Sequence, residues 1–512
     1  MSEIGFRHFA QRDRNRTAIV DPRGRSWSRG ELLDLIDRTA GALAAAGLSP
    51  GDVVAIVAPN CAEYLAVYLA GIEAGLYVVP VNWHLAEQEI AFILADSGAK
   101  AIVAHGSLGA IRLASLFDDS PKTTALISIG DAAGFTSLDA FIALRPAVAL
   151  AGRSAGRVMP YTSATTGRPK AVRRPLQGAE RALHKTVQWH LSLGIEIEQD
   201  NVHLCASMLY HSAPLEGAVI AMHMGHEVVL VDRWDPQGLL QLIQRYAVTT
   251  TFMVPAMFVR LLKLPSEIRG AYSTSSLRFV IHAGAPCPVD VKRRMIEWWG
   301  PIVWESYGAA EAQGAVVSPT DWLAHPGTVG RAIPGSRLKI LDDDGRELAP
   351  GEVGLIYMTP HTGDHFEYNG DPEKTLTCRR GEFVTVGDIG YLNEDGYLFV
   401  CDRKTDMIIS SGMNIYPAEI EQVLVQHPAV TDCAVVGVAH ELMGEVPKAV
   451  VQLASGLTPG PQLTADILRF LAERVSPMKL PKRVEYADRI PRDPNGKLYR
   501  RLLRDEAAKH AR

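Results

Sequence analysis

The sequence has few cysteines, no excess of charge of either sign and no long apolar run. Only six cysteines occur among 512 residues, and no two have Cys-x-x-Cys spacing. This scatter argues against a disulfide framework or a zinc site and is typical of reduced thiols. With 52 basic and 57 acidic residues the formal net charge is −5. We therefore expect neither nucleic acid nor an anionic membrane surface as a partner.

No segment has the length and apolarity of a membrane span. The most hydrophobic run, residues 64–81, contains Glu73 and Pro80, and its pattern predicts a buried helix that leads into a strand. Residues 1–15 are polar and lack the apolar core of a signal peptide. We expect a cytoplasmic protein without an integral membrane segment.

The length and the hydrophobic pattern predict a fold of the α/β class. A chain of 512 residues with 47% hydrophobic content should form at least two domains. Ser28, with Glu31 three positions later, is a candidate helix cap. Helical periodicity and short buried strands alternate, which favours largely parallel sheets. The expected helices are 28–46, 62–74 and 85–97, and the expected strands are 53–57, 77–81, 101–104, 227–231, 250–254 and 279–281.

The pattern changes in the second half of the chain. From about residue 338, turn signals at 343–345 and 394–396 lie between strand-like runs and predict hairpins. After Asp402 a new α+β unit is expected, with a helix starting at Pro417, a strand over 433–438 and a last amphipathic helix over 464–475. We place the domain boundary so that one domain spans residues 1–402 and the other 403–512.

The segment from Tyr161 to Val172 carries the strongest chemical signal. It combines four Ser/Thr hydroxyls, Gly167 and Lys170 within a few positions. Hydroxyls and backbone N–H groups can cradle an oxygen-rich anion, and a lysine adds a mobile positive charge. A surface turn is the plain alternative, but it gives no reason for the lysine after Gly-x-Pro. The spacing also differs from the Walker pattern.

This segment resembles the phosphate-binding signature of the acyl-adenylate-forming superfamily, which includes acyl-CoA synthetases, peptide-synthetase adenylation domains and beetle luciferases. The usual signature has glycine where Ala164 and Ala171 stand here. We expect each alanine to restrict the backbone, or to narrow its approach, where it meets phosphate. The resemblance implies an ATP-binding loop made of Thr162, Ser163, Ala164, Thr165, Thr166, Gly167 and Lys170.

A second segment, residues 304–311, resembles the superfamily's Tyr-Gly-x-Thr-Glu motif. The resemblance implies that the Tyr307 ring stacks on adenine and that Glu311 holds Mg²⁺, roles that suit an aromatic face and a hard carboxylate. Ala310 replaces the usual threonine. The residues assigned to ATP from this segment are Ser306, Tyr307, Gly308 and Ala310.

Two further segments resemble the ribose-binding and hinge motifs. Asp388 in Val-Gly-Asp and Arg403 in the long run 402–421 would contact the ribose of ATP. Thr405 stands at the usual hinge position, where the family has Asp or Lys, and we expect a mild effect because a hinge needs backbone freedom rather than charge. Ser411 and Gly412 would line the coenzyme A tunnel.

The remaining resemblances assign catalytic and pocket residues. Lys497, in Asn-Gly-Lys near the C-terminus, matches the catalytic lysine that neutralises the substrate carboxylate and the α-phosphate. With it we group Glu311 and His211, although His211 alone is equally typical of a buried hydrogen bonder. The strand end carrying Gly284, Ala285 and Pro286 would border adenine and the acyl group. The candidate acyl-pocket walls, for which core packing is the commoner role, are Val254, Met257 and Phe258.

Together these motifs predict an ATP-dependent acid–CoA ligase that uses ATP, Mg²⁺ and coenzyme A. The resemblance implies a large N-terminal domain of two αβ-layered subdomains plus a small β-barrel-like part, with a small mobile α+β C-terminal domain. The apolar pocket candidates favour a fatty or aromatic carboxylic acid. Transfer to a carrier-protein phosphopantetheine is the first alternative. A catalytically weak nucleotide-binding relative is the second, because Ala164, Ala310 and Thr405 depart from the family. The sequence leaves a homodimer open.

Overall fold

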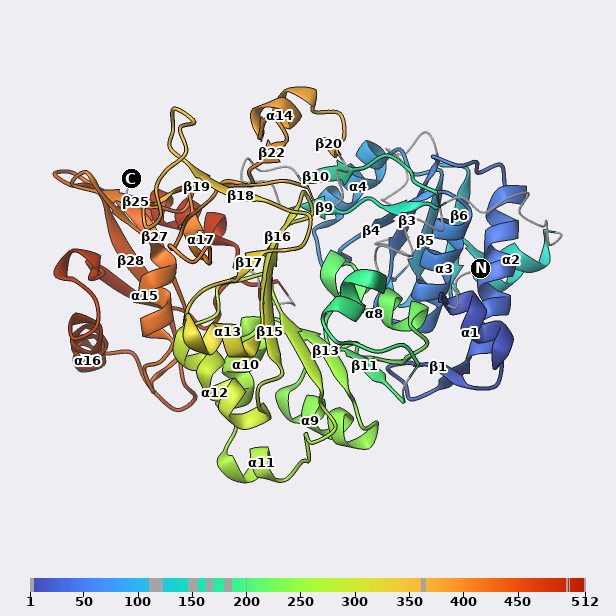
Figure 1. The fold of residues 1–512 in the computed structure, drawn as a ribbon, viewed down its shortest axis with the longest axis horizontal. Helices are drawn as coiled ribbons and strands as arrows, with labels where there is room; N and C mark the ends of the chain where they lie inside the picture. Colours follow the sequence, from blue (N-terminus) through green and yellow to red (C-terminus); the bar gives the residue numbers. More distant parts are fainter. Residues whose placement is uncertain are drawn as a thin grey trace. The chain divides into compact units, whose positions relative to one another are not determined.

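The computed structural model describes residues 4–109, 123–145, 155–162, 169–178, 187–198, 200–360, 365–493, 496 and 498–510. The chain divides into two compact units, and the elements of both are drawn in Figure 1. Unit 1 consists of Met1–Met253, Leu264–Val280 and Gly363–Thr377. Unit 2 consists of Val254–Lys263, Ile281–Thr362 and Cys378–Arg512.

The first sheet of unit 1 is parallel and has the strand order β7-β6-β5-β3-β4-β8. Its central strand β3 is buried along its whole length, as expected for a strand covered on both faces. Helices α2 and α3 pack side by side next to this sheet (Figure 1). The strands are β3 (Val53–Val57), β4 (Tyr77–Pro80), β5 (Ala101–His105), β6 (Ala125–Ile129), β7 (Thr136–Ser137) and β8 (Arg157–Val158). The helices are α2 (Arg29–Ala45), α3 (Ala62–Glu73), α4 (Glu87–Ser97) and α6 (Leu138–Ala143).

A second run of strands in unit 1 has the order β13-β11-β12-β1-β2. Apart from the β1–β2 pair, these neighbours are parallel. Helix α9 begins at Pro236, and the Asp235 carboxylate caps it by accepting the Gly238 N–H at 2.6 Å. The strands are β1 (Thr17–Val20), β2 (Ser26–Ser28), β11 (Val202–Cys205), β12 (Glu227–Leu230) and β13 (Thr250–Met253). The helices are α1 (Phe6–Arg12), α8 (Ser212–His223), α9 (Pro236–Arg245) and α11 (Ser266–Gly270).

A small antiparallel sheet in unit 1 holds the ends of the predicted phosphate loop. Strands β9 (Tyr161–Thr162) and β10 (Lys170–Arg173) pair as a hairpin, and β20 (Glu367–Tyr368) adds to the other edge of β10. Helix α14 (Pro372–Thr377) follows β20 directly. A segment from far along the chain thus completes this sheet.

Unit 2 begins with the strands that carry the predicted nucleotide motif. Strand β15 (Val303–Gly308) pairs antiparallel with β16 (Gln313–Val317), which pairs with β17 (Arg331–Ala332). Strand β14 (Phe279–His282) runs across the boundary between the units. The helices of this part are α10 (Pro255–Leu262), α12 (Val289–Trp299) and α13 (Pro319–Ala324).

The rest of unit 2 contains two antiparallel sheets with few helices. One has the order β21-β22-β19-β23-β24, with β18 also on β19; the other has the order β26-β25-β28-β27, with β29 parallel to β28. The first comprises β18 (Leu338–Leu341), β19 (Gly354–Met358), β21 (Arg379–Arg380), β22 (Phe383–Val384), β23 (Asp388–Leu392) and β24 (Leu398–Arg403). The second comprises β25 (Ile408–Ser410), β26 (Met413–Ile415), β27 (Val430–His440), β28 (Gly444–Leu453) and β29 (Arg483–Tyr486), with helices α15 (Pro417–Leu424), α16 (Pro461–Ala472) and α17 (Arg500–His510).

The predicted α/β class with a small α+β C-terminal part is confirmed. The capping box at Ser28 and Glu31 is present in full, and the turn at 394–396 joins β23 to β24. The expectation that the helix over 464–475 is the last one is wrong, because α17 follows. Its residues are mostly charged, and Arg500 pairs with Glu421 and Asp406, so ion pairs complement a short apolar stripe.

The described residues form neither a membrane-spanning helix nor a disulfide. Among those residues, no helix is both long and apolar enough to cross a bilayer. No disulfide joins any of the six cysteines, all of which are described.

Candidate nucleotide and acyl site

The two ends of the predicted phosphate loop are fixed by the hairpin of β9 and β10. Thr162 lies opposite Lys170 in this pair, and the Thr162 hydroxyl donates to the Lys170 carbonyl at 3.4 Å. The loop between them, with Ser163, Ala164, Thr165, Thr166 and Gly167, lies outside the described residues. The described part therefore supplies the frame of the loop and its lysine.

Ala171 does not lie where we expected it from the sequence. Its side chain is fully buried in an apolar cluster with Val79, Ile102 and Met159. Adjacent side chains of a strand point to opposite faces, so Ala171 points away from the face of Lys170. The expectation that Ala171 meets phosphate is wrong: its methyl group fills part of the core.

The Lys170 ammonium has a specific partner in unit 1. Its Nζ lies 2.7 Å from Oδ2 of Asp371, which directly precedes helix α14. The ammonium also lies 5.7 Å from the centre of the Tyr368 ring, within reach of a cation–π interaction. Sequence reasoning did not find Asp371 or Tyr368 as neighbours of the loop.

Three predicted nucleotide residues lie together in unit 2. The Tyr307 hydroxyl donates to Oδ2 of Asp388 at 2.7 Å, and Nε of Arg403 lies 3.3 Å from Oδ1 of the same carboxylate. They come from β15, β23 and β24, and β23 and β24 are paired with Asp388 opposite Arg403. Burial raises the pKa of Asp388, while Arg403 and Tyr307 oppose that rise. An aromatic ring, a carboxylate and a guanidinium thus form one cluster.

The rest of the 304–311 motif surrounds the β15–β16 turn. Glu311 is buried, with 6% of its surface exposed, whereas Ser306 and Ala310 are half-buried. Gly308 is exposed, yet a Cβ there would come within 2.9 Å of the Ala312 carbonyl. Only glycine fits this turn without a shift of the backbone.

The small-residue strand end is open, as expected for a surface that receives a ligand. Gly284, Ala285 and Pro286 are exposed, and Gly284 has φ +86°, which favours glycine. Among the described residues, a Cβ on Gly284 would meet Val254 alone, at 3.9 Å. The sequence-based assignment of this segment is compatible with its exposure.

His282, which ends β14 two residues before Gly284, belongs to a buried polar cluster that sequence reasoning missed. Lys292 is fully buried, and its ammonium donates to Oε2 of Glu305 at 2.6 Å. The His282 ring lies 3.5 Å from the same oxygen and packs edge-on against Phe258. Burial lowers the pKa of Lys292 and raises that of Glu305. The spacing of residues along the helix did not predict this cluster, because a lone lysine on a helix is usually exposed.

Lys497 lies outside the described residues, but Gly496 before it is described. A Cβ on Gly496 would come within 2.8 Å of the Ala256 methyl group and 3.9 Å of Val254. Val254 is therefore close both to Gly496 and to the exposed Gly284. Within unit 2, the turn preceding the predicted catalytic lysine shares a neighbour with the predicted ligand-binding strand end.

The predicted hinge and tunnel residues lie on the surface of the C-terminal part. Thr405 is exposed, and its carbonyl accepts a 2.6 Å hydrogen bond from the Arg504 guanidinium on α17. Ser411 and Gly412 form the exposed turn between β25 and β26, with φ +48° and +78°. A non-glycine residue at positive φ is uncommon and marks this turn as backbone under constraint.

His211 and the candidate pocket walls are placed as follows. In unit 1, His211 precedes helix α8 and its ring lies 4.6 Å from that of Tyr210. In unit 2, Met257 and Phe258 are buried core residues of α10, and Val254 directly precedes that helix. The structure thus divides the predicted residues between the units: Thr162, Lys170 and His211 in unit 1, and the remaining described ones in unit 2.

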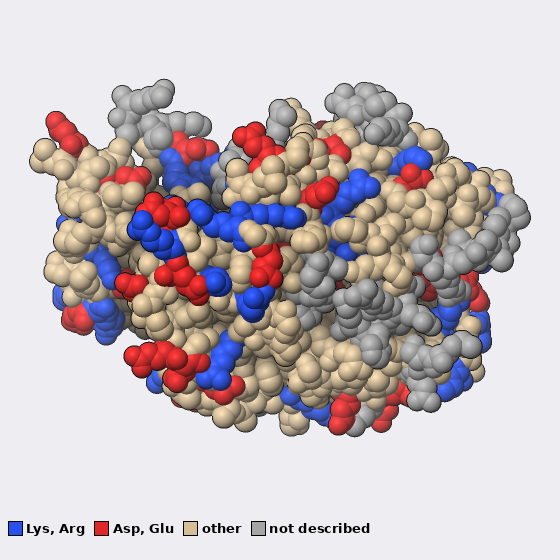
Figure 2. All heavy atoms as spheres, turned by 45° about the horizontal axis from the view of Figure 1, so that its top comes forward, with Lys and Arg blue, Asp and Glu red and all other residues tan. Residues whose placement is uncertain are grey.

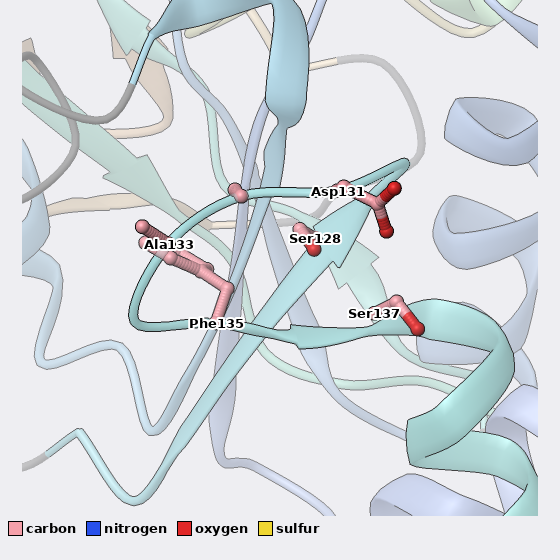
Figure 3. Close-up of a pocket in the computed structure, with 6 residues that line it drawn as sticks. Ser128, Asp131, Ala133, Phe135 and Ser137 are labelled. Carbon is pink, nitrogen blue, oxygen red and sulfur yellow. The ribbon is translucent and has the colours of Figure 1, made fainter.

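One hollow of the described surface is lined by residues other than those predicted for the site. A hollow of about 360 Å³ in unit 1 is lined by Ser128, Asp131, Phe135 and Ser137 with two alanines (Figure 3). None of the predicted site residues lines it. On the face shown in Figure 2, acidic and basic side chains are interspersed rather than gathered in one field of one sign, which agrees with the small net charge.

Comparison with known proteins adds an independent line of evidence. The profile of the family described as AMP-binding enzyme matches residues 6–362, and that of the AMP-binding enzyme C-terminal domain matches residues 419–497. The chain is 32% identical over 500 residues to a fatty acid–[acyl-carrier-protein] ligase of Streptomyces coeruleorubidus, covering 96% of this chain and 93% of the relative. It is 33% identical over 492 residues to a 2-succinylbenzoate–CoA ligase of Geobacillus kaustophilus, covering 96% and 94%.

A solved structure shares the fold over nearly the same length. The o-succinylbenzoate CoA synthetase of Bacillus subtilis, in complex with its acyl-adenylate intermediate, superposes with a TM-score of 0.81 at 28% identity, covering 97% of each chain. Both family profiles lie in the expected order and span most of the sequence. The chain therefore belongs to the AMP-binding enzyme family of adenylate-forming acid–thiol ligases.

Proposed function

We propose that this chain activates a fatty or aromatic carboxylic acid with ATP and transfers the acyl group to free coenzyme A. In the first step a carboxylate oxygen attacks the α-phosphorus of ATP, and pyrophosphate leaves. In the second step the thiolate sulfur attacks the acyl carbonyl carbon, and AMP leaves. The substrate supplies the first nucleophile, so no protein nucleophile is needed.

The cluster of Tyr307, Asp388 and Arg403 is the observation that carries this proposal. A ring face suits a purine, and a carboxylate suits the two hydroxyls of a ribose. Lys170 would neutralise phosphate charge, and Lys497 would neutralise the reacting carboxylate and α-phosphate. In this scheme the rate comes from positioning and charge neutralisation.

The residues present fit a bound magnesium ion. Glu311 offers a buried, hard carboxylate next to the exposed turn at Gly308, and Mg²⁺ prefers oxygen ligands. When bound with ATP, the ion supplies charge neutralisation to the phosphates. Glu311 would orient it, whereas the side chain of Ala310 carries no oxygen, unlike the threonine usual at this position.

Two acceptors compete for the second step. Free coenzyme A is the acceptor of the 2-succinylbenzoate ligase that this chain resembles, whereas the acyl-carrier protein is that of the fatty-acid ligase. Both thiols end in the same phosphopantetheine arm. The proposal of a fatty or aromatic acid rests on the apolar character of Val254, Met257 and Phe258 in the sequence.

The test is a screen of carboxylic acids by ATP–pyrophosphate exchange, followed by thiol-dependent AMP release. We expect exchange above background with at least one fatty or aromatic acid, and AMP release with coenzyme A exceeding that with holo carrier protein. Release only with carrier protein would favour the alternative acceptor. Exchange at background across a broad panel would instead identify a nucleotide-binding relative without activity.

A further inference from the structure

The cation of the predicted phosphate loop is held by a segment that no motif marks. Lys170 on β10 and Asp371 before α14 are 201 residues apart in sequence, yet their Nζ and Oδ2 atoms are 2.7 Å apart. The side chains are only partly exposed, 22% for Lys170 and 37% for Asp371. This contact lies wholly within unit 1.

The segment around Asp371 is fixed to the loop hairpin by its backbone. Strand β20 pairs with β10 through Tyr368 opposite Val172, and the Asn369 N–H donates to the Ala171 carbonyl at 3.0 Å. The Asn369 side chain also donates to the Asp96 carbonyl at 2.9 Å. Asp371 lies three residues after Tyr368 of β20, and its N–H donates to the Tyr368 carbonyl at 3.0 Å. The pairing of β20 with β10 therefore brings the two charges together.

The Asp371 carboxylate is itself oriented by a second bond. Its Oδ1 accepts the Lys374 N–H at 2.9 Å at the start of α14, which leaves Oδ2 facing Lys170. The hydrogen bond from Lys170 holds the pKa of the Asp371 carboxyl below its usual range. Because both oxygens are engaged, the carboxylate is a fixed reference point rather than a mobile counter-ion.

An ammonium group has three N–H donors, so one bond to Asp371 leaves two for another anion. A free lysine side chain would lose much rotamer freedom on binding phosphate. Asp371 and the Tyr368 ring restrict that freedom before a ligand arrives. Preorganisation of this kind improves binding by removing an ordering cost.

We propose that Asp371 is a positioning residue that holds the Lys170 ammonium ready for the polyphosphate of ATP. This rests on the proposed role of Lys170 in the adenylation step. Asp371 does not contact the reacting atoms; it acts through Lys170. The opposite possibility, that Asp371 competes with phosphate for the lysine, predicts a change of the opposite sign.

The test compares Asp371→Asn and Asp371→Ala in the full-length enzyme, alone and combined with Lys170→Met. Asn keeps the helix cap and an acceptor for the ammonium, so we expect the KM for ATP to rise about threefold, a typical effect of a partly exposed ion pair. Asp371→Ala should raise it about tenfold, because the lysine then has to be ordered by the ligand. The kcat should change less than the KM in both. In the Lys170→Met background neither substitution should have a further effect.

A matched control separates positioning from helix capping. Asp235 caps α9 in the same unit with a 2.6 Å bond to Gly238, so Asp235→Ala removes a comparable cap far along the sequence from the loop. We expect it to lower the unfolding temperature without changing the KM for ATP. Binding of tripolyphosphate, measured by calorimetry, gives a readout that does not depend on turnover and should weaken in the Asp371 variants.

A lower KM for ATP, or tighter tripolyphosphate binding, in Asp371→Asn would mean competition and overturn the proposal. An equal effect of Asp371→Ala with and without Lys170 would assign Asp371 a purely structural role. If Lys170→Met itself left ATP and tripolyphosphate binding unchanged, the assigned role of Lys170 would fail first.

Discussion

The Tyr307 hydroxyl donates a 2.7 Å hydrogen bond to Asp388, a residue 81 positions further along the chain. The other carboxylate oxygen of Asp388 faces Arg403 at 3.3 Å. Burial, followed by the Asp388 charge, raises the pKa of Tyr307 well above its ordinary value. The aromatic ring is thereby fixed relative to the carboxylate by its hydroxyl group.

Removing the Asp388 carboxylate should raise the KM for ATP more than removing the Tyr307 hydroxyl. Asp388→Asn should raise the KM for ATP at least about tenfold, because hydrogen bonds to a charged group are worth about 1.5–3 kcal/mol. Tyr307→Phe keeps both the ring face and the Asp388 carboxylate, so it acts on ATP only indirectly and should raise the KM about threefold, as for one neutral hydrogen bond. Initial rates of ATP–pyrophosphate exchange measure both. Tyr391→Phe, on the same strand as Asp388, is the matched control and should leave the KM unchanged. A larger loss in Tyr307→Phe than in Asp388→Asn would contradict this order.

Lys497→Ala should separate the two half-reactions. Adenylation should fall at least about 100-fold, the effect of losing a group that stabilises transition-state charge. Thioester formation from supplied acyl-AMP should change only about twofold, because Lys497 is assigned to the carboxylate and the α-phosphate that meet in the first step. Single-turnover assays of each half-reaction measure this. Lys479→Ala removes the same charge from a lysine paired with Glu419 and should spare both. Equal loss in both half-reactions would refute the role given to Lys497.

The buried pair of Lys292 and Glu305 should respond unusually to substitution. Lys292→Met alone should destabilise the protein by about 3 kcal/mol or more, because it leaves Glu305 buried without its partner. The double variant Lys292→Met with Glu305→Leu should be more stable than that single variant, since both desolvated charges are then gone. Urea unfolding followed by tryptophan fluorescence gives the comparison. If the two substitutions simply added, the pair would not be coupled as its 2.6 Å contact indicates.

Acid should destabilise unit 1 through buried histidines. Burial lowers the pKa of His223 from 6.5 to about 4, and its Nδ1 accepts the Phe6 N–H at 3.2 Å, which requires a neutral ring nitrogen. Above its unfolded pKa both states are neutral and there is no cost. As the pH falls below about 6.5, the histidine is protonated in the unfolded state but stays neutral in the folded state. The free energy of unfolding therefore falls by about 1.4 kcal/mol per pH unit until the folded pKa is reached.

The substitution His223→Gln isolates that contribution. Between about pH 7.5 and pH 5, it should remove roughly 2 kcal/mol of the pH-dependent loss in unfolding free energy. His440→Gln is the control: this histidine also accepts a backbone N–H at 3.2 Å, from Leu442, but it is exposed. Its pH profile should match that of the unaltered protein. A shared profile for all three proteins would show that His223 is not the titrating group.

Local features were predictable, whereas contacts between distant segments were not. The cap at Ser28 and the turn at 394–396 follow from residues within a few positions of each other. The contact of Lys170 with Asp371 depends on how β20 joins β10, and no local pattern carries that information. Helix α17 was missed because its sequence is dominated by charge, and its ion pairs with residues such as Glu421 are visible only after folding.

The ligand motifs were recognised as a pattern rather than deduced from spacing. The resemblance assigns Tyr307, Asp388 and Arg403 to one site. In the structure, Tyr307 and Arg403 both lie within hydrogen-bonding distance of the Asp388 carboxylate. The resemblance gave no warning that Ala171 is a core residue, because a signature records residue types and not the face of the strand on which each lies. The buried cluster at Lys292 had no signature.

The late arrival of β20 has a consequence for how the protein is made on the ribosome. Strand β10 pairs on one edge with β9 and on the other with β20, so its second edge stays open until the far segment is translated. The 201 residues between Lys170 and Asp371 take about 10–40 s at a synthesis rate of about 5–20 residues per second. During that interval one edge of β10 has unpaired backbone N–H and C=O groups, which a chaperone or another nascent chain can bind. Slow codons between the two segments would lengthen that exposure and lower the yield of folded enzyme.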